Sequence, residues 1–311
     1  MFFGFGWAVL GGFLLTSTKN WVHIRGYHGA ALMMLVAAWL LERLGMWFAG
    51  ALPRPLFLLG NNLFLVTIVL MLLRTLIAHR RDDSYRVDNR FFLVALPLFL
   101  VAKYLLLDAG TFATGWSMTL GLFRVAFLVM LERTLSQFMK GVFQTEILRA
   151  PPLDNAIKLL ALAMVFESLL PSMLAGATAL TLTSLLIARF CFWKPLVAMR
   201  RLDVAIMYLG YLALVSQLLL DGLGRFLDLH WIGTLPVHLF TFAVMGLIIP
   251  AMIVRIANGH TGRKVVFGTA DKAVLWIMIA AFVVRVLVPQ LAPERYPLWI
   301  HIAACCWTLG F

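Results

Sequence analysis

Long apolar stretches alternate with short polar stretches from one end of this chain to the other. Most of these stretches are close to the roughly 20 residues that an α-helix needs to cross a bilayer. None shows the residue-by-residue alternation of a membrane β-barrel strand. The pattern predicts an all-α transmembrane bundle of about eleven spans, at residues 2–17, 27–48, 55–77, 91–107, 112–131, 156–172, 174–192, 204–221, 234–256, 270–289 and 296–311.

Composition supports the same fold class. Of the 311 residues, 62% are hydrophobic and 13% are charged, whereas soluble domains contain about 25% charged residues. The mean hydropathy is +0.93. No soluble segment interrupts the pattern, so we expect a single transmembrane helical domain over residues 1–311. Both chain ends fall inside apolar stretches, and we therefore expect a chain truncated at both ends, from a protein of about twelve spans.

Positive charge is concentrated in every second loop. The chain has a formal net charge of +12 and contains 26 Lys and Arg residues. Nineteen of these 26 lie in the odd-numbered loops, counted from the N-terminus, and six lie in the even-numbered loops. Short loops rich in Lys and Arg stay in the cytoplasm, so we expect the odd-numbered loops there. Topology thus accounts for the charge, and we expect no nucleic-acid partner.

Two histidines lie at similar depths in different predicted spans. His238 is about four residues into the ninth span, and His301 is about five residues into the eleventh. Both spans run from outside to inside, so both rings lie roughly 6–8 Å below the outer helix ends. Neutral imidazoles there are suited to ligating one haem iron or sharing a copper ion. The alternative is a hydrogen-bonded packing histidine at the headgroup level.

The last predicted span also contains cysteines. Cys305 follows His301 by four residues, so both side chains lie on one helix face. An imidazole beside a thiol is a reasonable pair of copper ligands. Cys305 and Cys306 are also explained as small buried hydrophobes, and we favour that interpretation. The three cysteines of the chain form no disulfide framework.

Several ionisable side chains fall inside predicted spans. Arg124 is the deepest, and such a charge is either functional or paired, with Glu132 two turns further on as one candidate partner. Glu167 falls near the end of the sixth span, where a role near a proton path or metal and simple solvation at the interface are both open. Lys103 is expected to snorkel outward.

A Gly-His-Thr-Gly-Arg sequence follows the ninth span and contains His260 and Arg263. Gly259 is a natural helix terminator, so we expect a compact turn rich in hydrogen-bond donors just outside the membrane. Such a turn is suited to an anion, a haem propionate or the loop after the first span.

Four segments resemble the NnrS family, which are haem- and copper-containing bacterial membrane proteins of the nitric oxide response. The most specific is the Gly-His-Thr-Gly-Arg sequence with the preceding Arg255. The chain lacks a His-x-x-Glu element that the family has before the position of Met1, and lacks the usual glycine soon after Thr241. The other similar segments are residues 2–5 with 12–16 and 20–21, residues 209–211 and residues 238–246; residues 132–138 depart from the family's Gly-Arg-x-x-Pro-x-Phe-Thr.

The resemblance implies a multi-pass protein of the bacterial cytoplasmic (inner) membrane that carries haem b and copper. It implies relief of nitrosative stress, in or alongside denitrification, with a respiratory electron donor as a partner besides the lipid bilayer. Direct handling of nitric oxide and electron delivery that repairs nitrosylated iron centres are both open mechanisms, and whether the protein is an enzyme stays open. The haem or metal candidates are His238, His301, His260 and Arg263, with Cys305 for copper.

Two other classes of protein fit the pattern. A secondary transporter would use charges such as Arg124 and Glu167 within its spans. Paired broken helices would favour it, but Pro171 and Pro236 lie too near span ends to indicate them. A non-catalytic membrane scaffold is the third class, and it predicts that no single histidine matters.

Overall fold

The protein is built from helices. The computed structural model describes residues 2–227, 229, 231–262 and 264–311, with the backbone alone at His260. Helices account for 81% of the chain, and the described residues contain no strand. The chain divides into two compact units, Met1–Ala126 and Phe127–Phe311. The long helix α5 (Phe112–Phe143) contributes its first part to unit 1 and its second part to unit 2.

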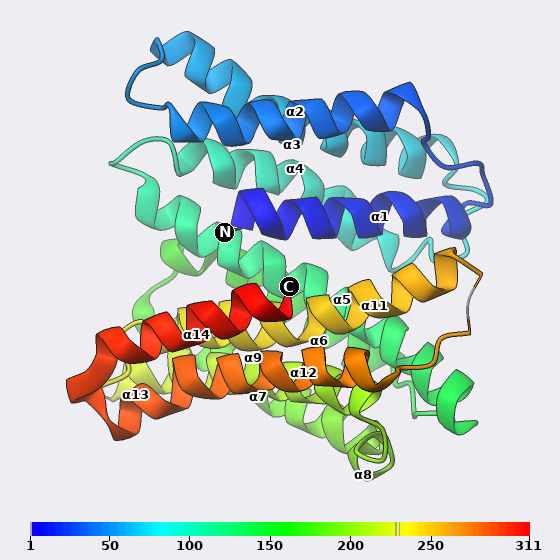
Figure 1. Ribbon diagram of the computed structural model, residues 1–311, viewed down its shortest axis with the longest axis vertical. Coiled ribbons are helices and arrows are strands. Elements are labelled where there is room, and N and C mark those ends of the chain that lie inside the picture. The colour runs from blue at the N-terminus through cyan, green and yellow to red at the C-terminus, as the bar shows by residue number, and fades with distance from the viewer. Residues whose placement is uncertain (1, 228, 230, 263) are drawn as a thin grey trace. The chain divides into compact units, whose positions relative to one another are not determined.

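Unit 1 is arranged around α3, which packs against α1, α2 and α4 (Figure 1). Apolar side chains from these helices form its core, and the Trp7 ring meets the edge of Phe99 at a centroid distance of 4.8 Å. The helices of the unit before α5 are the π-helix η1 (Phe2–Gly6), α1 (Trp7–Trp21), α2 (Ala30–Trp47), α3 (Arg54–Ala78) and α4 (Asn89–Leu105).

A buried ion pair joins α2 and α4 inside unit 1. Lys103 is 3% exposed, and its Nζ atom lies 2.9 Å from Oε1 of Glu42. Lys103 also donates to the backbone carbonyl of Asn61. The expectation that Lys103 snorkels outward is therefore wrong, because a carboxylate and a carbonyl inside the bundle replace the water that snorkelling would reach.

Unit 2 is arranged around α9, which packs against α7, α11 and the π-helix η3. Helices α12 and α14 lie antiparallel, side by side (Figure 1). The helices of this unit after α5 are α6 (Pro151–Ala163), η2 (Met164–Leu169), α7 (Ser172–Phe192), α8 (Pro195–Ala198), α9 (Leu202–Phe226), α10 (Leu235–His238), η3 (Leu239–Met245), α11 (Gly246–His260), α12 (Thr269–Phe282), η4 (Val283–Leu287), α13 (Val288–Leu291), η5 (Pro293–Arg295) and α14 (Tyr296–Gly310).

Two glycines allow α7 and α9 to approach closely. A Cβ atom added at Gly222 would lie 2.8 Å from the side chain of Leu180 and 3.3 Å from the carbonyl oxygen of Gly176. One added at Gly176 would lie 2.7 Å from the ring of Phe226. Small residues at such crossings let helix backbones pack tightly within a membrane, where the hydrophobic effect does not drive association.

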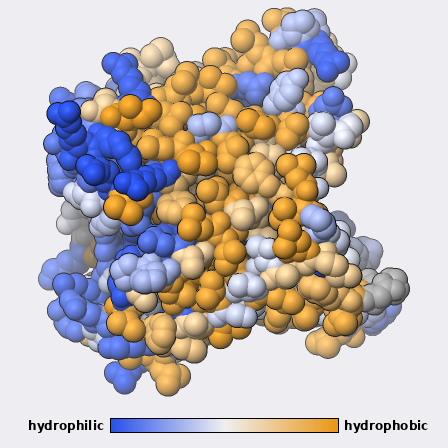
Figure 2. All heavy atoms as spheres, turned by 180° about the vertical axis from the view of Figure 1, so that it is seen from behind, coloured by the Kyte–Doolittle hydropathy of each residue, from blue (hydrophilic) through white to orange (hydrophobic). Residues whose placement is uncertain are grey.

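The helices have the length and apolarity of a multi-pass membrane protein. Figure 2 shows a broad expanse of apolar side chains on one face, with hydrophilic ones gathered along an edge. Among the described residues, seven helices are long and apolar enough to cross a bilayer. These seven are Ala30–Trp47, Arg54–Ala78, Phe112–Phe143, Ser172–Phe192, Leu202–Phe226, Leu235–Gly259 and Thr269–Leu291.

Each of the eleven apolar stretches is largely helical, but the count of about eleven spans stays a prediction. The four stretches outside the seven form shorter or interrupted helices. Helix α4 has 17 residues and α14 has 15. At 1.5 Å per residue α14 is about 22 Å long, less than the roughly 30 Å of a hydrocarbon core. The single domain over residues 1–311 likewise stays a prediction.

Candidate functional site

The histidine singled out in the ninth predicted span forms a pair with an arginine. His238 is the last residue of α10, and Arg285 is the middle residue of η4. Nη2 of Arg285 lies 2.9 Å from Nε2 of His238. Arginine is always protonated and can only donate, so Nε2 accepts the hydrogen bond. The imidazole at this position is therefore neutral, which is the form that ligates metals.

Aromatic residues surround the guanidinium of Arg285. Its Nη1 atom donates to the hydroxyl of Tyr296 over 3.2 Å. Its central carbon lies 5.4 Å from the centroid of the Tyr296 ring and 5.7 Å from that of Phe242. Cation–π contacts of this kind fix the plane of a guanidinium as well as its position. Arg285 is thus held beside Nε2 of the imidazole by residues from η3 and from the start of α14.

Both members of the pair lie at π-helical segments. The π-helix η3 begins directly after His238, and η4 contains Arg285. A proline follows each segment, Pro250 within α11 and Pro289 within α13. Proline offers no N–H to the carbonyl four residues earlier, which disturbs the α-helical ladder there. Single π-helical turns are rare and are frequent at functional sites, so this coincidence marks the pair as the candidate site.

The other two residues predicted for the outer side lie on α14. His301 and Cys305 are both exposed, one helical turn apart. The shared helix face expected from their spacing is therefore present, and the expectation that Cys305 is a buried hydrophobe is wrong. No hydrogen bond of His301 is found within the described part of the chain. The structure places Arg285, rather than a second imidazole, against Nε2 of His238.

The Gly-His-Thr-Gly-Arg sequence lies at the end of α11. The side chain of His260 and all of Arg263 fall outside the described residues. The preceding Arg255 is described, and its Nη2 atom lies 2.7 Å from Oδ2 of Asp203 at the start of α9. The Arg255 guanidinium also stacks 3.8 Å from the centroid of the Phe138 ring. Arg255 thus fastens the end of α11 to α9 and α5.

The two buried charges predicted to be functional lie in different units. Arg124, in the unit 1 part of α5, is 1% exposed. Glu167 is 6% exposed in η2 and lies 3.6 Å from Nη2 of Arg225. Arg225 also lies 3.5 Å from Asp221, one turn earlier in α9. Glu167 therefore belongs to an ion-pair group, which agrees with its facing the bundle rather than lipid.

Unit 2 contains a buried charge cluster that the sequence did not reveal. Glu132 on α5, 1% exposed, pairs with Arg149 and lies 3.5 Å from both Lys158 on α6 and Arg189 on α7. Arg189 also stacks over Trp193, 4.6 Å from the ring centroid. The available signal was that Asp154 and Lys158 lie four residues apart in α6, which places them on one helix face.

Family comparison covers the whole chain. The model of the NnrS protein family matches residues 1–311. The chain belongs to the NnrS family. No curated protein and no solved structure matches it. Family membership together with the apolar helices establishes a multi-pass membrane NnrS protein, and membership suggests haem and metal binding in general.

The residues of this NnrS protein fit haem better than they fit copper. A haem iron requires one or two protein ligands, and His238 offers a half-buried, neutral imidazole among apolar helices. Copper sites are commonly built from three or more His, Cys or Met ligands. Within the part of the chain that is described, no three His, Cys, Asp or Glu residues are grouped to hold a metal. Among the described residues, His238 thus offers a ligand that suits haem, and His, Cys, Asp and Glu residues do not gather in threes as a copper site of those residues would require.

Proposed function

We propose that this NnrS protein is a haem-containing redox protein of the bacterial inner membrane that protects cells from nitric oxide. The observation that carries the proposal is the neutral imidazole of His238, bonded to Arg285 where two π-helical segments meet. Such an imidazole is a competent iron ligand. Family membership supports the presence of haem.

Haem at this site would supply one-electron chemistry and an iron able to bind nitric oxide. The chain's own contribution comes from Arg285, which holds the His238 ring in one orientation. The guanidinium and a metal would compete for the same Nε2 lone pair, so ligation through Nε2 would require Arg285 to release the ring. The released cation would then be available to an anionic group, while Tyr296 and Phe242 retain it near the site.

The remaining members of the proposed site are assigned from the resemblance. We propose His301 as the second haem ligand and His260 with Arg263 as a further binding site on the cytoplasmic side. Cys305, one turn from His301 on the exposed face of α14, is the proposed copper ligand. A respiratory electron donor is the proposed partner, and the odd-numbered loops are proposed to be cytoplasmic.

Growth under nitric oxide tests this function in cells. A strain lacking the gene is complemented with the wild-type gene or with His238→Ala, and both are exposed to a nitric oxide donor. We expect the wild type to restore growth and His238→Ala to fail at equal membrane abundance. The matched control is His23→Asn, which removes an exposed imidazole at a positive φ of 54° that asparagine tolerates. Equal protection by all three proteins would rule out the proposal.

A further inference from the structure

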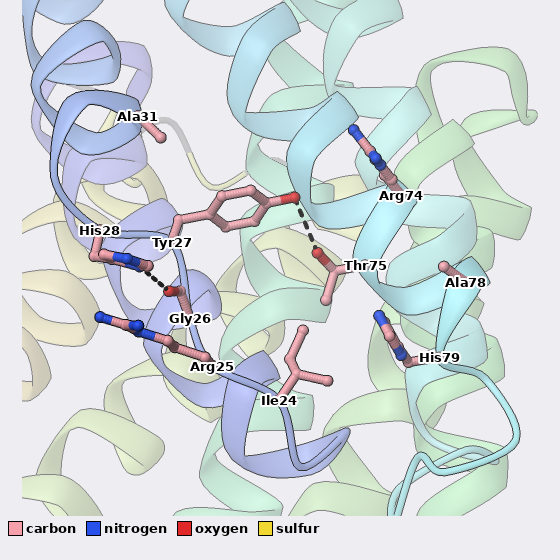
Figure 3. Close-up of a pocket in the computed structure, with 10 residues that line it drawn as sticks. All are labelled: Ile24, Arg25, Gly26, Tyr27, His28, Ala31, Arg74, Thr75, Ala78 and His79. Atoms are coloured by element: carbon pink, nitrogen blue, oxygen red, sulfur yellow. Dashed lines mark hydrogen bonds between the residues drawn. The ribbon is translucent and has the colours of Figure 1, made fainter.

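The α1–α2 loop and the end of α3 line an open hollow of about 460 Å³ in unit 1 (Figure 3). Arg25 and His28 line it from the loop, and Arg74 and His79 line it from α3 and its C-terminal cap. None of the described residues that line it is acidic. The hollow is within the size range of ordinary ligand sites, and its charge is of one sign.

The two arginines carry permanent charges that no described residue neutralises. Within the described residues, neither Arg25 nor Arg74 makes a hydrogen bond or an ion pair. Arg43 in the same unit, by contrast, pairs with Glu42. Unpaired guanidinium groups on opposite walls of one hollow attract an anion, and each offers five donors in a planar fork suited to phosphate.

The wall that bears Arg25 is held in place by hydrogen bonds. The Tyr27 hydroxyl lies 3.2 Å from both the carbonyl oxygen of Met71 and the hydroxyl of Thr75, which ties the loop to α3. Nδ1 of His28 lies 2.9 Å from the carbonyl oxygen of Gly26, so Nδ1 must donate. This bond leaves Nε2 of His28 for another partner. The loop is thus ordered before any ligand binds.

A second hollow, of about 370 Å³, shares Arg25 and His28 with the first. Leu15 on α1 and Leu32 on α2 give it apolar walls, and Lys19 adds a further positive charge. Both hollows lie beside the C-terminal end of α1 and the N-terminal end of α2. Apolar walls next to a basic hollow match an amphiphile whose anionic group lies at the helix ends and whose chain lies along the helices.

We propose that this basic hollow binds a phosphate group, with Arg25 and His28, which line both hollows, as its principal ligands and with the positive charge of Arg74 attracting it from the α3 side (Figure 3). An anionic phospholipid and a small soluble phosphate compound present the same group. The adjoining apolar hollow favours the lipid. The site lies wholly in unit 1, whereas the His238–Arg285 pair lies in unit 2. The proposed phosphate site therefore does not depend on the proposed haem function.

Native mass spectrometry of the detergent-purified protein tests the site. Wild type, Arg25→Gln/Arg74→Gln and Arg86→Gln/Arg90→Gln are each incubated with phosphatidylglycerol or phosphatidylcholine. The second double variant is the control, because it removes two exposed charges from the same end of unit 1 outside both hollows. Melting temperatures verify folding, and Arg25→Lys/Arg74→Lys provides a variant that keeps the charge but loses the planar fork.

We expect wild type and control to retain phosphatidylglycerol preferentially, and Arg25→Gln/Arg74→Gln to retain at least about tenfold less. The lysine variant should be intermediate. A parallel titration with inorganic phosphate, followed by thermal shift, identifies the source of the group. Stabilisation of wild type but not of Arg25→Gln/Arg74→Gln, without lipid preference, assigns the hollow to soluble phosphates. Equal binding by that variant and the control, for both probes, overturns the proposal.

Discussion

Nη2 of Arg285 lies 2.9 Å from Nε2 of His238, on one of the two nitrogens through which an imidazole binds metals. The arginine therefore has two effects. It keeps the ring neutral and oriented, and it occupies the lone pair that an iron ion would use. Which effect is larger decides how a substitution at residue 285 changes haem affinity.

We expect Arg285→Met to bind haem more tightly than the wild type. Methionine keeps much of the side-chain length but offers no donor, so iron no longer competes with a charge-assisted hydrogen bond. Such a bond contributes roughly 1.5–3 kcal/mol, which corresponds to an increase of about tenfold or more in affinity. Haemin titration of apo-protein, followed by absorbance, measures the change.

The matched control for that titration is Tyr296→Phe. It removes the second hydrogen bond of Arg285 and leaves the bond to His238 in place. Its haem affinity should stay close to that of the wild type. Weaker binding by Arg285→Met would mean that orientation of the ring outweighs competition for Nε2, contrary to the expectation.

The helical segments followed from the sequence, but the candidate site did not. Apolar length identified the long helices, because burial in lipid imposes a long apolar run, but it did not predict that α5 continues to Phe143 or that α8 forms. The pairing of His238 with Arg285 depends on two π-helical segments and on which helices are neighbours. The local pattern of apolar residues predicts neither the π-helical segments nor the neighbouring helices. A single arginine four residues before Pro289, inside an otherwise apolar stretch, was the one available signal.

The buried cluster of unit 2 was missed for a related reason. Loop charge explains Lys158 and Arg189 as topology signals, yet both are at most 2% exposed. Only the folded chain shows that Glu132 draws them together. Conversely, the exposure of His301 and Cys305 follows from how α14 packs, which spacing along one helix cannot determine.

Glu132 should be important for the stability of unit 2. We expect Glu132→Gln to lower the free energy of unfolding by roughly 3–5 kcal/mol, because it removes the carboxylate that lies 3.5 Å from the buried Lys158 and leaves the buried Arg189 with Asp154 alone. Glu146→Gln is the control, since the Glu146 side chain is 78% exposed and its pair with Lys140 should contribute no more than about 1 kcal/mol. Thermal or denaturant unfolding in detergent measures both, and equal losses would show that the cluster is not stabilising.

The close crossing of α7 and α9 should not tolerate a large residue. We expect Gly222→Leu to destabilise the protein by about 1–3 kcal/mol or more, because the new side chain would meet Leu180 and the backbone of Gly176. Gly45→Leu on α2 is the control, since a Cβ atom there meets nothing within 4 Å. Melting temperatures compare the two variants. A normal melting temperature for Gly222→Leu would show that the helices can separate without cost.

Cysteine labelling tests which side of the membrane the loops before and after α4 face, and whether α4 crosses the membrane. Ser84 and Gly110 are exposed residues on either side of α4. In a background with the three native cysteines replaced by alanine, we expect an impermeant maleimide added outside intact spheroplasts to label Gly110→Cys and not Ser84→Cys. Permeabilised cells should label both. Labelling of both cysteines from outside would show that α4 does not span.

The absorbance spectrum of the protein purified from haem-replete cells tests the central claim most directly. We expect a Soret band in the wild type and in His23→Asn, and its loss or marked shift in His238→Ala at equal protein concentration and unchanged melting temperature. An identical Soret band in His238→Ala, or a wild type without any haem absorbance, would contradict the assignment of His238 as a haem ligand.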